Sequence, residues 1–194
     1  MAIQKETKEL KKEFVPEDLK NLPEGTQAEV INGKMYLLAA PSTEHQRLVG
    51  FFFLEIANYI RSHNGTCEVF PSPFDVFLET KKENGEQKNH VVQPDLLVIC
   101  DPDKITDHGC KGAPDLVIEI TSPSTAGRDY LQKMNLYREA GVREYWIVDP
   151  DMETVGVYFF DRGYAPMEYT FTDYIPVNIY DDLSIRIKEP DDES

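Results

Sequence analysis

The sequence contains little cysteine and no long apolar segment. Its three cysteines, Cys67, Cys100 and Cys110, form no C-x-x-C pair, which excludes a zinc cluster, and their odd number suits a reducing cytosol. The longest apolar runs, 51–54 and 96–100, are too short to span a bilayer, and the charged N-terminus lacks the apolar stretch of a signal peptide. We therefore expect a cytoplasmic protein without a membrane partner, whose core needs no disulfide or metal.

Basic residues are also scarce. The chain has 20 Lys and Arg against 35 Asp and Glu, a formal net charge of -15. The acidity lies towards the C-terminus, whereas residues 81–143 are nearly neutral. Because phosphates are attracted by clustered Lys and Arg, this balance argues against non-specific binding to nucleic acid or to anionic membranes.

The length of 194 residues indicates one domain. Residues 1–13 alternate Lys and Glu and are expected to form a flexible extension, 189–194 an acidic tail, and 14–188 the single domain.

Periodicity and turn residues predict an α/β fold with a mixed sheet. Strand, helix, strand in the second half indicates a parallel crossover. The expected elements are a short helix at 16–22, a hairpin of 27–31 and 34–39 around Asn32-Gly33, a helix to about 63 capped by Ser42 or Thr43, strands at 66–70 and 74–78, a polar loop at 79–89, buried strands at 91–100 and 115–121, a helix at 125–140, a strand at 144–148, and a β-meander from 154–160, 164–171 and 183–187.

Two acids stand inside apolar strands. Asp95 begins one buried run and Glu119 lies within the other. A buried carboxylate must be hydrogen-bonded, paired with a cation or bound to a metal. If the strands are neighbours, both carboxylates can hold one hard divalent cation, with a backbone carbonyl and waters completing the octahedron of Mg²⁺.

A phosphodiester hydrolase would also need a lysine near this pair, to orient the attacking water and offset charge in the transition state. Position 121, which shares a strand face with Glu119, is threonine. The next lysine is Lys133, in the following predicted helix. The alternative from the residues alone is that Asp115, Glu119 and Lys133 form a structural ion pair or a helix cap.

Three segments carry a family resemblance: GAPDLVIEITSPSTAGRDYLQKMNLYREAGVREYWIVDP at 112–150, QPDLLV before it, and APSTEHQRLVG earlier. Together they resemble the Uma-two family of restriction endonucleases, in the PD-(D/E)XK nuclease superfamily, over residues 16–187. The resemblance implies a restriction-endonuclease-like mixed β-sheet core flanked by helices, with an added C-terminal β-meander.

The resemblance also implies roles for residues at matching positions. Asp95 becomes a metal ligand, Glu119 the acid of the E-x-K element, and Lys133 the displaced functional lysine. The backbone carbonyl of Ile120 would assist in holding the cation. Secondary candidates are Glu44 and His45, which match a first-helix position that can approach the metal, and Ser122, Ser124 and Arg128, which would bind phosphate at a helix N-terminus or, for the serines, only cap that helix.

The function implied is a Mg²⁺-dependent (or Mn²⁺-dependent) endodeoxyribonuclease, with DNA as substrate and a homodimer as the assembly. The sequence does not decide between DNA and RNA, or between single- and double-stranded substrates. The alternative is a catalytically inactive nuclease-fold protein acting as an interaction or regulatory module, which the net charge of -15 favours.

Overall fold

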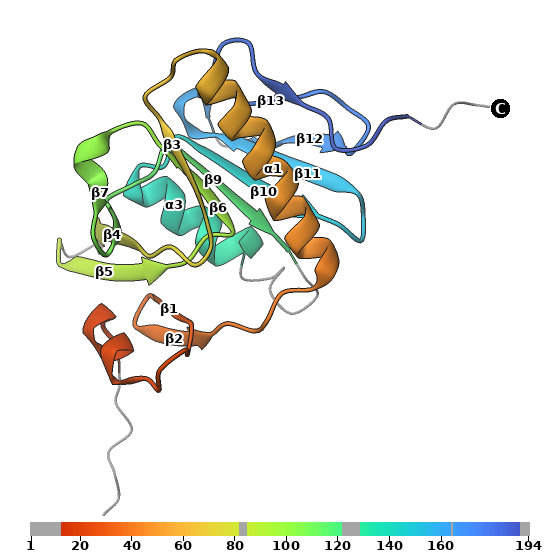
Figure 1. The fold of residues 1–194 in the computed structure, drawn as a ribbon. Coiled ribbons are helices and arrows are strands. Elements are labelled where there is room, and N and C mark those ends of the chain that lie inside the picture. Colours follow the sequence, from red (N-terminus) through yellow and green to blue (C-terminus); the bar gives the residue numbers. More distant parts are fainter. Residues whose placement is uncertain (1–12, 82–84, 122–128, 164, 191–194) are drawn as a thin grey trace, which may run out of the picture.

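The computed structural model describes residues 13–81, 85–121, 129–163 and 165–190 (Figure 1). The expected extension, apart from residue 13, and residues 191–194 of the expected acidic tail lie outside these ranges. The elements are η1 (Pro16–Asn21), β1 (Ala28–Ile31), β2 (Lys34–Leu37), α1 (Thr43–Ser62), β3 (Glu68–Pro71), β4 (Val76–Lys81), β5 (Gln87–Val92), β6 (Leu96–Ile99), η2 (Pro102–Lys104), β7 (Ile105–Thr106), β8 (Gly109–Lys111), β9 (Leu116–Ile120), the π-helical turn η3 (Asp129–Lys133), α3 (Met134–Ala140), β10 (Glu144–Asp149), β11 (Thr154–Phe159), η4 (Phe160–Arg162), β12 (Met167–Thr170), β13 (Ile175–Pro176) and β14 (Ser184–Ile185).

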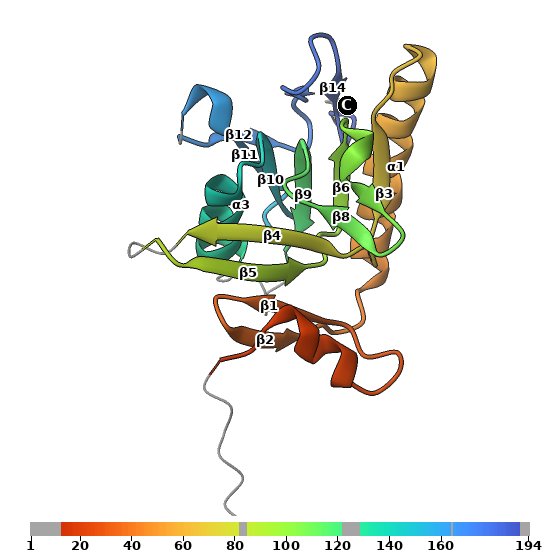
Figure 2. The ribbon, with the colours of Figure 1, turned by 90° about the vertical axis from the view of Figure 1, so that its left-hand side faces the viewer.

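The strands form two six-stranded mixed sheets and a small pair. The first sheet has the order β2-β1-β5-β4-β8-β7 and the second the order β12-β11-β10-β9-β6-β3. Figure 2 shows the strands of the first sheet running crosswise to those of the second. The predicted α/β class with a mixed sheet is confirmed.

The first sheet begins with the predicted hairpin. Asn32 and Gly33 both have positive φ, 52° and 75°, as a two-residue type I′ turn requires, and β1 and β2 pair in antiparallel register on either side of it. Each of these features is local in sequence, which is why the pattern identifies the hairpin.

Two predictions in the middle of the chain are wrong. The segment 79–89 is not one polar loop, because β4 continues to Lys81 and pairs with β5 from Gln87. The run 91–100 is not one strand: it divides at Pro94, which has no N–H for a ladder, so β5 joins the first sheet and β6 the second. The paired ends of β4 and β5, residues 79–81 and 87–90, consist of polar residues, which conceals both strands in the sequence.

The second sheet forms the centre of the molecule. β9 pairs in parallel with β10 and antiparallel with β6, and the connection from β9 to β10 carries α3, as predicted for a crossover. Apolar side chains cover both faces. One core cluster includes Phe52, Ile118 and Trp146, and the other includes Val117, Tyr137 and Tyr145.

Helices α1 and α3 lie on opposite faces of this sheet (Figures 1 and 2). Ser42, one of the two predicted capping residues, caps α1 by accepting the N–H of His45, and Gly141 ends α3 with a φ of 93°. The first part of the predicted helix 125–140 lies outside the described residues.

The C-terminal part is only partly the expected meander. β11 and β12 extend the second sheet in antiparallel order, but β14 pairs with β13 in a separate two-stranded sheet. Phe171, Ile175 and Ile185 from this region complete the core beneath α1. No helix among the described ranges is long and apolar enough to cross a bilayer.

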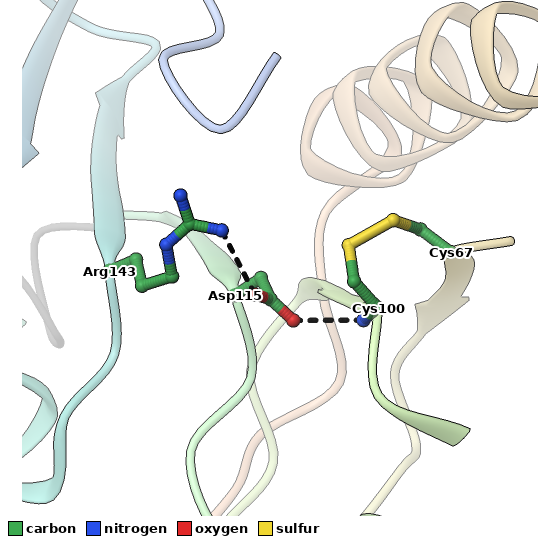
Figure 3. The surroundings of a disulfide bond; sticks show 4 residues. All are labelled: Cys67, Cys100, Asp115 and Arg143. Carbon is green, nitrogen blue, oxygen red and sulfur yellow. Dashed lines mark hydrogen bonds and ion pairs between the residues drawn. A yellow bond between two sulfur atoms is a disulfide. The ribbon is translucent and has the colours of Figure 1, made fainter. Parts of the chain in front are cut away.

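A disulfide joins Cys67 and Cys100, which the sequence analysis did not expect, because it took the odd number of cysteines as typical of a reducing cytosol (Figure 3). Glu68 pairs with Ile99 across β3 and β6, so the two cysteines form the next pair in that antiparallel register. The sequence does not indicate this bond because 33 residues separate the two cysteines and only the pairing of β3 with β6 brings them together. Cys110 is a free thiol in β8, and burial raises its pKa to about 11.

A buried histidine links the hairpins of the first sheet. The His90 side chain, 1% exposed, accepts the N–H of Asn32 through Nδ1 at 3.2 Å and contacts Thr80 Oγ1 through Nε2 at 2.9 Å. Burial, together with the charge of Lys88, lowers the pKa of His90 from 6.5 to about 4. The neutral imidazole is therefore the form that the fold accommodates.

This histidine predicts a pH dependence of stability. Its pKa is lower in the folded than in the unfolded chain. Above pH 6.5 the imidazole is neutral in both states, so His90 causes no change in the unfolding free energy there. Between pH 6.5 and 4 His90 becomes protonated in the unfolded chain but stays largely neutral in the folded protein. Protonation of the unfolded state lowers the unfolding free energy by about 3 kcal/mol over this range. Urea unfolding of the wild type and of His90→Asn at pH 7 and 4 should show the extra loss only in the wild type. Parallel losses would contradict the assignment.

Candidate active site

A cleft of about 690 Å³ lies at one end of the second sheet. It is lined by the connection between β2 and α1, the first turn of α1, the residue that precedes β6, the end of β9, Lys133 of η3, and residues 150 and 151 after β10. The carboxyl ends of the parallel strands β9 and β10 therefore meet here, which is the usual place for a ligand in a sheet of this kind.

Asp95 and Glu119 both line this cleft. Leu96 pairs with Ile118 across the antiparallel strands β6 and β9, so Asp95 and Glu119 form the next pair of opposite residues, on one face of the sheet. Asp95 Oδ2 accepts the N–H of Ile120 at 2.7 Å, which fixes the carboxylate against the end of β9. The structure thus brings together the two acids that the sequence singled out.

Lys133 reaches the same place from η3. Its Nζ lies 2.7 Å from Glu119 Oε1, and its side chain is only 2% exposed. Tyr137, one helical turn further along, donates its hydroxyl to the same Glu119 oxygen at 2.7 Å. Burial, and then the nearby Glu119 carboxylate, raises the pKa of Tyr137 well above 10, so this hydroxyl stays a donor.

Glu29 is a site residue that the sequence analysis missed. It comes from β1 in the first sheet, is fully buried, and its Oε1 lies 2.7 Å from Lys133 Nζ. The same oxygen accepts the N–H of Gln93 at 3.1 Å. The available signal was an acid within the apolar strand AEVI, the same signal that identified Asp95 and Glu119; for Tyr137 it was the spacing of four residues from Lys133.

His45 and Glu44 lie at the first turn of α1, and both line the cleft. His45 Nε2 is 3.0 Å from Asp95 Oδ1, so this histidine does approach the acid pair. Its Nδ1 is buried and has no hydrogen-bond partner in the part of the chain that the structure describes. Glu44 is exposed at the rim.

The other secondary candidates, Ser122, Ser124 and Arg128, lie outside the described residues. Thr121, at the position where the family resemblance leads one to look for a lysine, is buried and donates its hydroxyl to Val148 O at 3.3 Å. This threonine therefore joins β9 to β10, while the ammonium arrives from η3.

A second Pro-Asp element occupies the opposite end of the same strand pair. Pro114-Asp115 precedes β9 as Pro94-Asp95 precedes β6, and Asp115 Oδ2 accepts the N–H of Cys100 at 2.8 Å. Its other oxygen pairs with Arg143 at 3.2 Å (Figure 3). Both aspartates thus fix the end of a neighbouring strand, but only Asp95 lines the cleft.

The chemistry of the cleft suits a hard cation. Asp95 and Glu119 supply carboxylate oxygens side by side, the type of donor that Mg²⁺ and Mn²⁺ prefer, and Ile120 lies next to them in the cleft wall. Across the described ranges, no group of three or more His, Cys, Asp or Glu side chains is arranged to hold a metal. A Mg²⁺ bound here would therefore have few ligands from the protein, and water or substrate would fill its remaining coordination positions, as is usual for this ion.

The two mixed sheets with their flanking helices form the fold of a protein solved as a putative nuclease, which is described below. The family model of Uma2, described as "Putative restriction endonuclease", matches residues 16–188, and the chain belongs to this family.

The chain is also similar to two other proteins. The fold resembles the crystal structure of "a putative nuclease belonging to DUF820" from Anabaena variabilis, with a TM-score of 0.70, 20% identity, and coverage of 90% of this chain and 95% of the other. An uncharacterised protein of Synechocystis sp., sll1609, is 26% identical over 126 residues, which cover 63% of this chain and 66% of that protein.

Proposed function

We propose that this protein is an endonuclease that hydrolyses phosphodiester bonds of DNA with Mg²⁺ or Mn²⁺. The observation that carries the proposal is the meeting of Asp95 and Glu119 on adjacent strands in an open cleft, with Lys133 Nζ 2.7 Å from Glu119. Membership of the Uma2 family supports the same activity.

Each residue has a role that follows from its position. Asp95 and Glu119, assisted by the carbonyl of Ile120, would hold the cation, which when bound supplies Lewis acidity and a water of lowered pKa. Lys133 would orient the attacking water from the Glu119 side. His45, in contact with Asp95 Oδ1, would keep that carboxylate turned into the cleft.

The negative charge of the protein sets the conditions for activity. Among the described residues that line the cleft, four are acidic (Glu44, Asp95, Glu119 and Asp151) and the basic one is Lys133, which is already paired with Glu119. A polyanionic substrate therefore depends on bound cations for attraction to the cleft. We expect cleavage to need divalent cation at every salt concentration.

The assembly that we propose is a homodimer, since a symmetric pair can address both strands of a duplex. The candidate contact surface is formed by the strands after Trp146, where β12 is an edge strand with Met167 exposed. A solution mass of twice 22.3 kDa by light scattering tests this part. A mass of one chain would remove it.

The activity is tested by titrating the wild-type protein with Mn²⁺ and Mg²⁺ and assaying plasmid, linear duplex, single-stranded DNA and RNA at low salt. The proposal expects saturable metal binding and metal-dependent nicking or cleavage of DNA. Absence of both, with a folded protein, would instead support an inactive interaction or regulatory module. Cleavage of RNA but not of DNA would show that the proposed substrate is wrong.

A further inference from the structure

The Lys133 ammonium lies between two carboxylates rather than one. Glu119 Oε1 and Glu29 Oε1 are each 2.7 Å from Nζ, and all three side chains are almost fully buried. The two acids come from different sheets: Glu29 from β1 and Glu119 from β9. The ammonium therefore joins the two sheets at the floor of the cleft.

Glu29 is also joined to the segment that carries Asp95. The Oε1 atom that contacts Lys133 accepts the N–H of Gln93, two residues before Asp95. One oxygen of Glu29 thus touches both the helix turn that supplies the ammonium and the chain that turns into β6. A displacement of this oxygen would move both relative to Glu119.

The formal charge of this group points to a role beyond packing. Glu29 and Glu119 place two carboxylates against one ammonium in a nearly water-free position. Because charges interact strongly where water is excluded, the charge of Glu29 influences how strongly the Lys133 ammonium is attracted to Glu119.

From these contacts we propose that Glu29 is a positioning residue for the cleft, and this inference rests on the proposed function. Glu29 shares the Lys133 ammonium with Glu119, and thereby leaves the Glu119 carboxylate available to a divalent cation. Without the charge of Glu29, the ammonium is drawn wholly to Glu119 and competes with the cation for that carboxylate.

The test is the isosteric change Glu29→Gln, which keeps an oxygen acceptor for Gln93 N–H but removes the charge. We expect kcat to fall by about 10–100-fold with KM nearly unchanged, and Mn²⁺ affinity, measured by calorimetry without substrate, to weaken by about tenfold or more. Glu29→Asp, which keeps the charge, should recover most of the Mn²⁺ affinity.

Glu144 provides a matched control. It is also a fully buried glutamate, bonded to Trp146 Nε1, Asn178 Nδ2 and the N–H of Ile179, but it lies at the other end of the second sheet from the cleft. Glu144→Gln should lower stability without changing kcat or Mn²⁺ affinity per folded molecule.

The outcomes separate the two proposals. If the wild type binds Mn²⁺ and Glu29→Gln binds it equally well with unchanged kcat, or if Glu144→Gln causes the same losses, the role of Glu29 is overturned and the nuclease proposal stands. If the wild type binds Mn²⁺ without cleaving DNA, the role of Glu29 is tested by comparing the Mn²⁺ affinities of the wild type and Glu29→Gln alone. If the wild type neither binds Mn²⁺ nor cleaves, the proposed function fails, and the role of Glu29 fails with it.

Discussion

Replacing Asp95 with asparagine is expected to lower kcat for metal-dependent cleavage by about 10³-fold. The bound cation stabilises the transition state by several kcal/mol, and this stabilisation is lost because a neutral amide does not hold the cation. Folding should change little. Asp95 Oδ2 accepts the N–H of Ile120, and the amide oxygen of asparagine can accept the same bond. Asp95→Ala removes that acceptor too and should cost a further 1–3 kcal/mol or so of stability.

The second Pro-Asp element supplies the control for this experiment. Asp115 accepts the N–H of Cys100 as Asp95 accepts that of Ile120, but it pairs with Arg143 and does not line the cleft. Asp115→Asn should therefore leave kcat and Mn²⁺ affinity at wild-type values. If Asp95→Asn cleaves DNA at the wild-type rate, the two-carboxylate mechanism is wrong.

Replacing Lys133 with methionine should destabilise the fold by about 3–5 kcal/mol, since it leaves the buried carboxylates of Glu29 and Glu119 without their cation. The same change removes the competitor for Glu119 Oε1, so Mn²⁺ should bind more tightly than to the wild type. Cleavage should nevertheless fall by about 10²-fold or more, because the donor to the attacking water is lost.

The measurement is urea unfolding with and without Mn²⁺. At a concentration of 100 times Kd the ion should return about 2.7 kcal/mol to the Lys133→Met protein. Lys104→Met is the control, since Lys104 Nζ donates to the backbone carbonyl of Ala113, and within the described ranges its loss leaves no buried carboxylate without a cation. A Lys133→Met protein as stable as the wild type, or one indifferent to Mn²⁺, contradicts the arrangement described above.

The presence of Asp115 shows that a Pro-Asp sequence alone does not identify a site. At both ends of the β6–β9 pair, the aspartate accepts an N–H at the end of the neighbouring strand, which is a structural role. The difference lies in the second carboxylate oxygen: Arg143 occupies it for Asp115, whereas for Asp95 it faces His45 in the cleft. Whether a Pro-Asp aspartate is a candidate metal ligand therefore depends on the residues that surround its second carboxylate oxygen.

Local pattern was sufficient for several elements. The Asn32-Gly33 hairpin, helix α1 with its Ser42 cap and the crossover through α3 to β10 follow from turn residues, capping residues and apolar periodicity, all of which act over a few positions. The acids inside apolar strands likewise marked Asp95 and Glu119, because an ionised group in such a run needs a partner. Their catalytic roles stay predictions.

Tertiary structure alone decided the features that join distant segments. The division of 91–100 between two sheets, the Cys67–Cys100 disulfide and the convergence of Glu29, Glu119 and Lys133 each depend on which strands become neighbours. Pairing energies are shared among many weak contacts far apart in the chain, so no short stretch of sequence encodes them. The sequence by itself determined which side chains needed a partner, and the packing of two crossed sheets determined which partners they received.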